Sequence, residues 1–422
     1  MGGNGRLNSR YSWFIKVLLI STLFVLSSCD GKSKDVIRSN FFGIHINNSK
    51  SPSTGTTLSD NLGNGSIRLW DARVSWRHLE PQKGKFNFEL LDGLVARAIK
   101  NDQEIVLTMG QPPDWATGGK ALTPFGTGYN SLPPENIEDW RSYVRTVGER
   151  YKGQIKYYEI WNEPNLKDFY SGSIIELVNL TREANQILKR IDPENKVISP
   201  SVTGDATYLN DYLRLGGSKV VDIIGVHLYV SPELPEKSIS MIKKYKEVMF
   251  KNKVGELPLW NTEWTWLNFM LDGKLNDTQL MPETMASAYL ARKFFIDVGM
   301  GIDRSFFYGF NYGASKIRLV DDNNPKWILM PSVAYKNVTS WLTGAKVLDF
   351  SYNNRRDTYK LSILSSEGKK AIIIWTKNSL KEFKIPSDFD EEGKYYSVIG
   401  EVKEYHKRKV QLTDIPIIVY EQ

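Results

Sequence analysis

The chain has 422 residues, of which 41% are hydrophobic and 12% aromatic, so it can bury one large core and a smaller second one. Its formal net charge is +7, with 55 basic and 48 acidic residues interspersed, and the basic run over residues 403–409 is short. We therefore expect no nucleic-acid binding. The single cysteine excludes a disulfide framework and fits an exported protein.

Residues 1–28 are predicted to be a lipoprotein signal peptide. Arg6, Arg10 and Lys16 precede or border an apolar stretch, residues 17–26, that is too short to span a bilayer comfortably. The sequence that ends at Cys29 resembles a bacterial lipobox, which implies cleavage before Cys29 and lipidation of its thiol. We then expect a tether over residues 29–40 and a cell-envelope protein, lipid-anchored to a membrane and facing the periplasm or the exterior. The alternative is an ordinary secretory signal with a chance cysteine.

Eight short apolar runs alternate with helical patterns between residue 41 and about residue 344. We expect these runs to be strands, and they cover residues 41–46, 66–70, 104–110, 155–161, 196–202, 221–230, 257–263 and 303–310. Eight strand–helix pairs in roughly 300 residues predict an α/β fold, a (β/α)8 TIM barrel over residues 41–345. A doubly wound open sheet is the alternative, but it would carry a glycine-rich turn after an early strand, where this chain has His45-Ile46-Asn47-Asn48.

Two of the helices have clear sequence signals. Apolar residues from Ile137 to Tyr151 follow one another at alternating spacings of three and four, and the pattern stops at Gly153. Ser173 and Glu176 have the spacing of a capping box, in which each side chain binds the backbone N–H of the other residue. We therefore expect helices that begin near residues 137 and 174.

The pattern of apolar residues changes after Gly344. Short β-like runs, without a long helical pattern, cover residues 349–352, 359–364, 371–375, 395–399 and 415–420. Turn residues such as Asn353-Asn354 and Glu367-Gly368 separate them. This pattern predicts a small C-terminal β-sandwich domain over residues 346–422.

Two glutamates stand where strands of the predicted barrel end. Glu163 follows the fourth run, in the sequence Asn162-Glu163-Pro164, and Glu263 ends the seventh. Catalytic groups of (β/α)8 barrels lie at the C-terminal ends of the strands. Two carboxyl groups that face one pocket are the minimum equipment for cleaving a glycosidic bond. The three-residue motif is a weak signal alone, and its position at a strand end strengthens it.

With this placement the chain resembles the clan A glycoside hydrolases, which are retaining enzymes. Residues 76–86 match a segment common in that clan, and residues 111–116 point to family-39-like members; the set resembles exopolysaccharide-operon hydrolases of the PslG type. The resemblance implies that Glu163 is the acid/base and Glu263 the nucleophile. It also implies that Asn162 binds the sugar 2-hydroxyl.

Four further residues are candidates for the same pocket. Arg68 lies inside an apolar strand and needs a carboxylate partner, because an unpaired buried charge is costly; the resemblance pairs it with Glu263. His227 and Tyr229 are two residues apart and face the same way, and the resemblance puts them beside the nucleophile and the bound sugar. His45 ends the first strand. The alternatives are a structural ion pair for Arg68 and a core position for each histidine.

Aromatic residues at or just past strand ends are candidate platforms for stacking against sugar rings. They are Trp115, Trp264, Trp266 and Tyr308, and for each the alternative is core packing. Many clan members carry a tryptophan on the eighth strand, where this chain has Tyr308. The departure bears on which sugar the pocket holds.

Other polar residues have less specific expectations. Glu159 lies deeper in strand four, as a core ion-pair member would, whereas Asp71 and Asp114 lie at strand ends and could line the cleft. Only four histidines occur, and no cluster has the spacing of metal ligands. The sequence holds no Gly-x-Ser-x-Gly elbow and no phosphate-binding loop. We expect neither a metal nor a cofactor.

Together these features predict a lipid-anchored retaining β-glycosidase that cleaves a bacterial exopolysaccharide internally during its synthesis, export or turnover. The expected partners are the polysaccharide or oligosaccharide substrate, the membrane through Cys29, and exopolysaccharide export machinery. The alternatives are an exo-acting β-xylosidase-like glycosidase and a non-catalytic polysaccharide-binding lipoprotein; a basic peripheral membrane protein is a more distant one. Loops over residues 115–132 and 268–282 are expected to shape the barrel mouth.

Overall fold

The computed structural model describes residues 36–46, 62–119, 130–267, 270–271, 274–275, 280–310, 315–321, 328–353, 355 and 357–421. The predicted signal peptide, Cys29 and part of the predicted tether lie outside these residues, as do large parts of the two predicted mouth loops. All described residues fall within one compact unit. Within them, every helix is too short or too polar to cross a bilayer.

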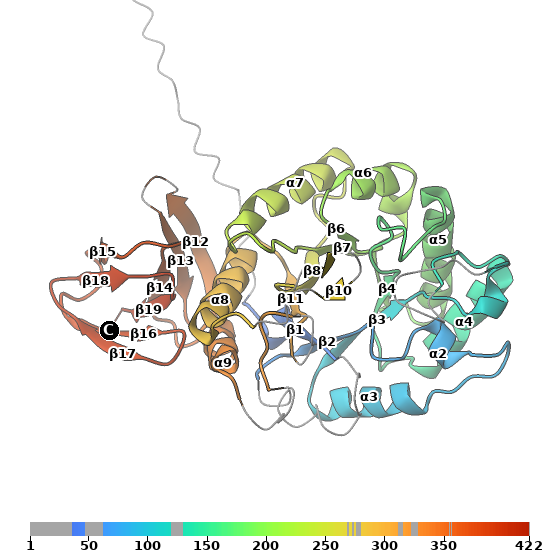
Figure 1. Ribbon diagram of the computed structural model, residues 1–422, viewed down its shortest axis with the longest axis horizontal. Coiled ribbons are helices and arrows are strands. Elements are labelled where there is room, and N and C mark those ends of the chain that lie inside the picture. Colours follow the sequence, from blue (N-terminus) through green and yellow to red (C-terminus); the bar gives the residue numbers. More distant parts are fainter. Residues whose placement is uncertain are drawn as a thin grey trace, which may run out of the picture. The chain divides into compact units, whose positions relative to one another are not determined.

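A ring of parallel strands forms the centre of the larger domain, with helices around it (Figure 1). The strands are β1 (Phe42–His45), β2 (Ser66–Leu69), β3 (Glu104–Met109), β4 (Tyr157–Ile160), β5 (Lys196–Ile198), β6 (Val202–Thr203), β7 (Ile224–His227), β8 (Leu259–Trp264) and β11 (Arg304–Phe307). They pair in the order β5-β4-β3-β2-β1-β11-β8-β7-β6. A parallel bridge between Ile198 and Ile223 closes the ring. The predicted (β/α)8 barrel is confirmed.

The fifth barrel position is split into two strands. The sequence predicts one strand over residues 196–202, but β5 ends at Ile198 and β6 begins at Val202. Pro200 lies in the gap and has no N–H to donate to a ladder. The Ser199 side chain bridges part of it, because its Oγ accepts a hydrogen bond of 3.0 Å from Gly225 N.

Both helices with clear sequence signals form where they are expected. Helix α4 (Ile137–Arg150) begins after the N-cap Asn136, and α5 (Ile174–Ile191) begins after Ser173 with both hydrogen bonds of the capping box. The other elements between the strands are η1 (Ser39–Phe41), α2 (Trp76–Leu79), α3 (Glu89–Lys100), η2 (Asp114–Ala116), α6 (Thr207–Arg214), η3 (Gly217–Lys219), α7 (Lys237–Lys251), the hairpin β9 (Met270–Leu271) and β10 (Lys274–Leu275), α8 (Glu283–Gly299) and α9 (Met330–Leu342).

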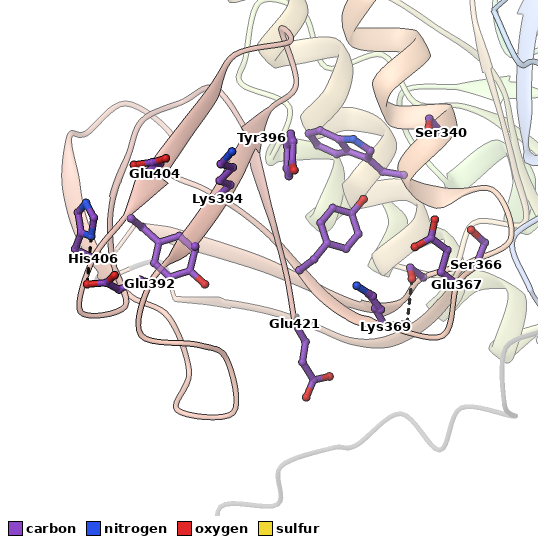
Figure 2. Close-up of a pocket in the computed structure, with 15 residues that line it drawn as sticks. Ser340, Ser366, Glu367, Lys369, Glu392, Lys394, Tyr396, Glu404, His406 and Glu421 are labelled. Carbon is purple, nitrogen blue, oxygen red and sulfur yellow. Dashed lines mark hydrogen bonds and ion pairs between the residues drawn. The ribbon is translucent and has the colours of Figure 1, made fainter.

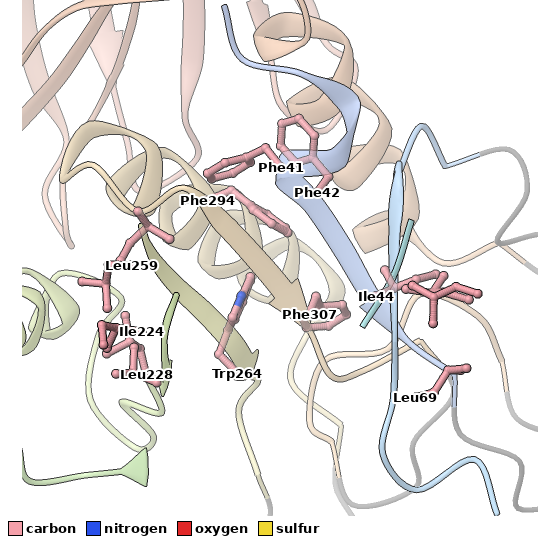
Figure 3. Packing of buried hydrophobic residues seen from close by; sticks show 14 of the residues in the cluster. Phe41, Phe42, Ile44, Leu69, Ile224, Leu228, Leu259, Trp264, Phe294 and Phe307 are labelled. Carbon is pink, nitrogen blue, oxygen red and sulfur yellow. The ribbon is translucent and has the colours of Figure 1, made fainter. Parts of the chain in front are cut away.

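Apolar side chains fill both sides of the barrel wall. Between the strands and the helices, Phe42 of β1 and Trp264 of β8 pack on Phe294 of α8, with ring centroids 5.6 and 5.0 Å apart (Figure 3). A separate cluster inside the ring contains Val106, Tyr157, Ile198, Ile223, Trp260 and Phe306. The barrel interior is therefore a packed core, and the polar site begins above it.

Residues beyond α9 form an antiparallel β-domain. Its strands are β12 (Lys346–Asn353), β13 (Thr358–Leu364), β14 (Lys370–Trp375), β15 (Lys381–Lys384), β16 (Gly393–Ser397), β17 (Val402–Tyr405), β18 (Lys409–Leu412) and β19 (Ile417–Tyr420). Six make one sheet, ordered β12-β13-β14-β19-β16-β17, and β15 pairs with β18. Ile372 and Ile374 of β14 pack in a core with Val410 and Leu412 of β18, so two sheets face each other as the sequence predicts.

Three strands of the β-domain have no counterpart among the sequence predictions. Strands β15, β17 and β18 are each four residues long and contain three, two and one charged residues, respectively. Such segments lack the apolar run that a strand prediction needs. They form because β15 and β18 pair with each other and β17 pairs with β16.

A buried ion pair joins the barrel to the β-domain. Arg292 of α8 donates to both carboxylate oxygens of Glu236, at 2.8 and 2.5 Å, and both residues are buried. Trp375 of β14 donates from Nε1 to the same carboxylate at 2.8 Å. Glu236 lies directly before α7, so this contact ties the β-domain to the segment that follows β7.

Candidate active site

A strained turn presents Glu163. Strand β4 ends at Ile160, and the backbone then takes left-handed conformations at Trp161 (φ 74°) and Glu163 (φ 42°). Each such residue costs about 1–3 kcal/mol, and this kind of strain is concentrated at functional sites. Backbone hydrogen bonds hold the turn, from Trp161 N to Met109 O and from Glu163 N to Ser201 O, both 2.8 Å long.

A β-bulge in β8 turns Glu263 toward the barrel interior. Trp260 packs inside the ring, and Thr262 also points inward, to Ser201. Strict alternation would then direct Glu263 outward. The register of β8 shifts against both β7 and β11 at this point, so Glu263 faces the interior as well, and Trp264 points outward to the helices.

The two predicted catalytic carboxylates lie side by side. An oxygen of Glu163, an oxygen of Glu263 and a ring nitrogen of His227 all lie within 4.8 Å of one another. Glu163 is 7% exposed and Glu263 is 5% exposed, so both carboxyl groups are buried. Carboxyl groups about 5–5.5 Å apart belong to retaining glycosidases, whereas about 6.5–9.5 Å leaves room for the water of an inverting enzyme. The separation fits the retaining geometry.

Arg68 links three acidic or amide groups at the base of the site. Its guanidinium donates to Glu263 Oε2 at 2.6 Å, to Asn162 Oδ1 at 2.7 Å, and to Glu159 Oε2 from Nε and Nη2 at 2.8 and 2.5 Å. Arg68 is fully buried. The expected pairing with Glu263 is present, and Glu159 is the core ion-pair member that its position in β4 indicates.

His227 and Tyr229 contact different glutamates. His227 Nδ1 lies 2.7 Å from Glu163 Oε1, and Tyr229 donates its hydroxyl to Glu263 Oε1 at 2.5 Å. The sequence puts both beside the nucleophile, and a ring nitrogen of His227 also lies within 4.8 Å of an oxygen of Glu263. His45 Nδ1 lies 3.9 Å from Glu263 Oε2, which places it in the pocket.

Burial and the charge of Arg68 shift the pKa values of the ionisable groups in the site. Burial raises the pKa of Glu163 to about 7, although Arg68 acts in the opposite direction. Burial also raises the pKa of Glu263, opposed by His227, Arg68 and the hydrogen bond from Tyr229. Glu159 differs, because Arg68 outweighs the effect of burial and its pKa lies below the usual value. Burial lowers the pKa of His227 to about 4. At neutral pH the site therefore holds a neutral imidazole beside a carboxyl that is partly protonated.

Two of the predicted stacking tryptophans are core residues. Trp264 is fully buried between β8 and α8, where its Nε1 donates to Ser305 Oγ at 2.8 Å. Trp266 is 2% exposed and donates to Glu233 O at 3.1 Å. The prediction of a sugar platform is wrong for both, since neither ring has a free face. For Trp264 the cause is the bulge, which directs it outward.

Of the two other aromatic candidates, Trp115 is partly exposed and Tyr308 is buried at 8% exposure. Trp115 is half-buried, with its ring edge-on to Trp76, its Nε1 bonded to Glu80 O at 3.0 Å and Lys83 Nζ 5.6 Å from its ring centre. No contact with the carboxylate pair links it to the site. Tyr308 lies beside His45, with ring centroids 4.6 Å apart, and donates its hydroxyl to Asp71 Oδ2.

Hydroxyl groups that the sequence analysis did not single out complete the site. Thr108 donates to Glu159 Oε2 at 2.6 Å, and Ser201 donates to Glu159 Oε1. Thr262 donates to Ser201 at 2.8 Å, and its carbonyl contacts His45 Nε2 at 2.9 Å. Serine and threonine at strand ends are too common to mark a site. The signal available was their position at the ends of strands already assigned to the barrel.

Among the described residues, the cluster of Glu163, His227 and Glu263 is the one whose ligand atoms are near enough to hold a metal ion. A separate cavity of about 850 Å³ lies between the β-domain and α9, which contributes Ser340 and Trp341 (Figure 2). Its lining includes Tyr396, Lys394 and Glu404, and no predicted site residue takes part. The residues with glycosidase chemistry gather in the barrel.

Comparison with known proteins agrees with this geometry. Residues 63–266, just under half of the chain, match the family described as Glycosyl hydrolases family 39. A Beta-xylosidase of Caldicellulosiruptor saccharolyticus is 27% identical over 42% of this chain and 40% of its own length. A Beta-xylosidase of Geobacillus stearothermophilus is 24% identical over 49% of this chain and 45% of its own length. The chain therefore spans less than half the length of these curated relatives.

A solved structure extends the similarity of fold to nearly the whole chain. A family 39 glycoside hydrolase from Bacteroides cellulosilyticus WH2 superposes with a TM-score of 0.72 at 18% identity, covering 91% of this chain and 81% of that one. At this identity the likeness shows the fold, and the paired carboxylates lie as close together as those of retaining glycosidases. Residues 63–266 are the part of the barrel domain that resembles the family 39 glycosyl hydrolases in sequence.

Proposed function

We propose that this protein is a retaining β-glycosidase with Glu163 as acid/base and Glu263 as nucleophile. The observation that carries the proposal is the separation of the two carboxylates, whose oxygens lie within 4.8 Å of each other. Retention also requires two carboxyl groups of unlike protonation. Burial raises the pKa of both carboxyl groups, to about 7 for Glu163. The direct contacts of Arg68 and Tyr229 with Glu263 favour its ionised form and so support the difference.

The proposed reaction has two steps. Glu263 attacks the anomeric carbon while Glu163 gives its proton to the leaving oxygen, which forms a glycosyl–enzyme ester and releases the first product. Glu163, now ionised, takes a proton from water, and that water cleaves the ester with a second inversion at the same carbon. Arg68 and Tyr229 hold Glu263 in place, and Asn162 is positioned by Arg68 to bind a sugar hydroxyl.

The proposed substrate is a bacterial exopolysaccharide that the enzyme cleaves internally. The sequence resemblance to exopolysaccharide-operon hydrolases supports it, and so does the predicted lipid anchor at Cys29, which would hold the enzyme at the envelope where such polymers are made and exported. The anchor, the envelope location and contact with export machinery belong to the same proposal.

An exo-acting β-xylosidase is the second candidate. Both curated relatives are named Beta-xylosidase, and their similarity lies in the barrel that holds the carboxylates. An exo-acting enzyme would release single sugars from chain ends and from small aryl glycosides. A non-catalytic polysaccharide-binding protein is the third, and the presence of both glutamates and Asn162 in one pocket argues against it.

One experiment separates these candidates. The purified protein and its Glu263→Gln variant are incubated with the host's extracellular polysaccharide, with xylo-oligosaccharides and with aryl β-xyloside, and product size is followed. Fragmentation of the polymer by the wild type alone supports the endo-acting enzyme, and release of xylose alone supports the exo-acting one. Proton NMR of the first product should show the retained anomer; an inverted anomer would contradict the mechanism. Binding without turnover by the wild type would favour the binding protein.

A further inference from the structure

Three buried polar atoms around the carboxylate pair have no hydrogen-bond partner among the described residues. They are Nδ1 of His45, Nε2 of His227 and Oδ1 of Asp71. His45 is 1% exposed and His227 is fully buried. Because buried polar atoms in folded proteins almost always have a partner, these three atoms are the groups of the site that can bind a ligand in the pocket.

The contacts of His45 identify it as a hydrogen-bond acceptor on the pocket side. Its Nε2 lies 2.9 Å from the backbone carbonyl oxygen of Thr262, which can only accept, so Nε2 carries the hydrogen. Burial, followed by Arg68, lowers the pKa of His45 well below its usual value, so the ring is neutral. Nδ1 therefore presents a lone pair. It lies 3.9 Å from Glu263 Oε2, which is itself an acceptor.

Asp71 presents a second acceptor next to this histidine. It follows β2 after Trp70, and its Oδ2 is occupied by the hydroxyl of Tyr308, whose ring lies 4.6 Å from the ring of His45. Strand β1 lies between β2 and β11 in the barrel, so Asp71, His45 and Tyr308 come from three adjacent positions in the ring. Oδ1 of Asp71 is left for a ligand.

Two neighbouring hydrogen-bond acceptors favour a ligand that carries hydrogen-bond donors. A sugar hydroxyl can donate a hydrogen bond, whereas a carboxylate, sulfate or phosphate group only accepts and carries a negative charge. The positive charge of Arg68 is offset by the carboxylates of Glu159 and Glu263, to which its guanidinium is bound. The charge and the hydrogen-bonding capacity of this corner therefore disfavour an acidic sugar.

We propose that Asp71, together with His45, determines sugar specificity beside Glu263 by accepting hydrogen bonds from the hydroxyls of a neutral sugar ring and excluding anionic sugars such as uronic acids. Tyr308 positions Asp71 for this role. The inference rests on the proposed glycosidase function and narrows its substrate class to neutral sugars.

The test measures kcat/KM on the p-nitrophenyl β-glycosides of xylose, glucose, galactose and glucuronic acid. The wild type should favour its best neutral glycoside over the glucuronide by about 100-fold or more. Asp71→Asn should lower kcat/KM on that neutral glycoside by about tenfold or more, because one of the two acceptor oxygens becomes an NH2 group, which cannot accept a hydrogen bond. The same substitution should also reduce the ratio of kcat/KM on the neutral glycoside to kcat/KM on the glucuronide, because the negative charge of Asp71 is removed.

Two further variants keep the inference falsifiable. Asp168→Asn removes the same charge from an exposed position on the segment after β4, and should leave the preference unchanged. If circular dichroism shows that Asp71→Asn does not fold, Tyr308→Phe is used for the test instead, because it keeps the ring beside His45 and removes the hydroxyl that binds Asp71. Like Asp71→Asn, it should lower kcat/KM on the neutral glycoside and reduce the preference for that glycoside over the glucuronide.

The outcomes distinguish the inference from the function it rests on. Two outcomes would overturn the role of Asp71 and leave the glycosidase function standing. One is a wild type that prefers the glucuronide. The other is a folded Asp71→Asn variant, or Tyr308→Phe in its place, whose kcat/KM on the neutral glycoside stays within about twofold of the wild type. No turnover of any glycoside or polysaccharide by the wild type would overturn the proposed function, and the inference with it.

Discussion

Arg68 is the residue on which the site depends for charge balance. It is fully buried and is the cation in contact with two buried carboxylates, Glu159 and Glu263. Breaking a buried ion pair by removing one partner costs about 3–5 kcal/mol, since the remaining charge has no compensation. The stability of the barrel and the orientation of Glu263 are therefore linked through one side chain.

We predict that Arg68→Met lowers the free energy of unfolding by about 3–5 kcal/mol, because Glu159 and Glu263 lose their shared cation. Urea unfolding at pH 7 measures it. Arg150→Met is the matched control: Arg150 pairs with Asp92 at the surface, with side chains 43% and 41% exposed, and should cost about 0–1 kcal/mol. Equal losses of unfolding free energy in the two variants would show that the buried ion pairs stabilise the fold no more than the exposed one does.

The pH dependence of activity should follow Glu163. Its pKa is raised to about 7 by burial, and its protonated form is the proposed acid, so kcat/KM for an aryl glycoside with a poor leaving group should fall as pH rises above about 7. A leaving group that needs no proton should weaken this dependence for the first step. A flat profile up to pH 9 with the poor leaving group would argue against Glu163 as the acid.

The same shift has a consequence for stability. The folded-state pKa of about 7 lies above the ordinary value of 4.5, so the folded state binds the proton more tightly. The stability that this contributes is present below pH 4.5 and is lost as pH rises through about 7. Glu163→Gln should remove this fall of stability with pH. Urea unfolding of the wild type and of the variant between pH 5 and 8 tests the prediction.

At the level of single residues, sequence reasoning succeeded where position in a strand decides the role. Glu163, Glu263, Arg68 and Glu159 could be placed because each sits in or just after an apolar run. It failed for Trp264, because a one-residue bulge in β8 reverses which side chains face inward. A bulge depends on pairing with two neighbouring strands, which periodicity along one chain does not record.

At the level of elements, local signals predicted most of the barrel. The eight expected strands all occur, and the helix starts at residues 137 and 174 were recognisable from their spacing and caps. The split of the fifth strand was missed although Pro200 marks it. The short charged strands β15, β17 and β18 were missed because they are stabilised by their partners in the β-domain rather than by their own apolar content.

The capping box of α5 gives a prediction at this scale. Ser173 Oγ accepts from Glu176 N at 3.2 Å, and Glu176 Oε2 accepts from Ser173 N at 2.8 Å. Ser173→Ala should cost about 1 kcal/mol in the free energy of unfolding and leave kcat unchanged. Ser142→Ala, at an exposed position inside α4, is the control and should be neutral or slightly stabilising. No difference between the two would mean that tertiary packing alone fixes the start of α5.

At the scale of the whole molecule, one face of the large sheet of the β-domain belongs to the main core. Ile373, Trp375 and Tyr359 lie in the same apolar cluster as residues of α8 and α9, whereas Ile372 and Ile374 belong to the separate core of the β-domain. A strand that is buried on both faces in this way, such as β14, cannot leave the barrel without exposing apolar area to water. We therefore expect the barrel and the β-domain to unfold in one cooperative transition.

The buried carboxylate of Glu236 makes this coupling testable. Trp375→Phe keeps an aromatic ring in the interface but removes the indole N–H that binds Glu236, so it should cost about 1.5–3 kcal/mol. Trp341→Phe is the matched control, because Trp341 packs its ring on Phe295 in the same region and should cost less. Urea unfolding followed by fluorescence and by circular dichroism measures both variants.

The Trp375→Phe substitution should also lower activity. Glu236 lies on the segment between β7 and α7, which also carries Tyr229, the hydrogen-bond donor to Glu263. If the β-domain holds this segment in place, Trp375→Phe lowers kcat by a few-fold while KM changes little, and the two unfolding probes still give one transition. A variant with normal kcat and two separate transitions would show instead that the β-domain is an independent unit, and that the barrel positions Tyr229 on its own.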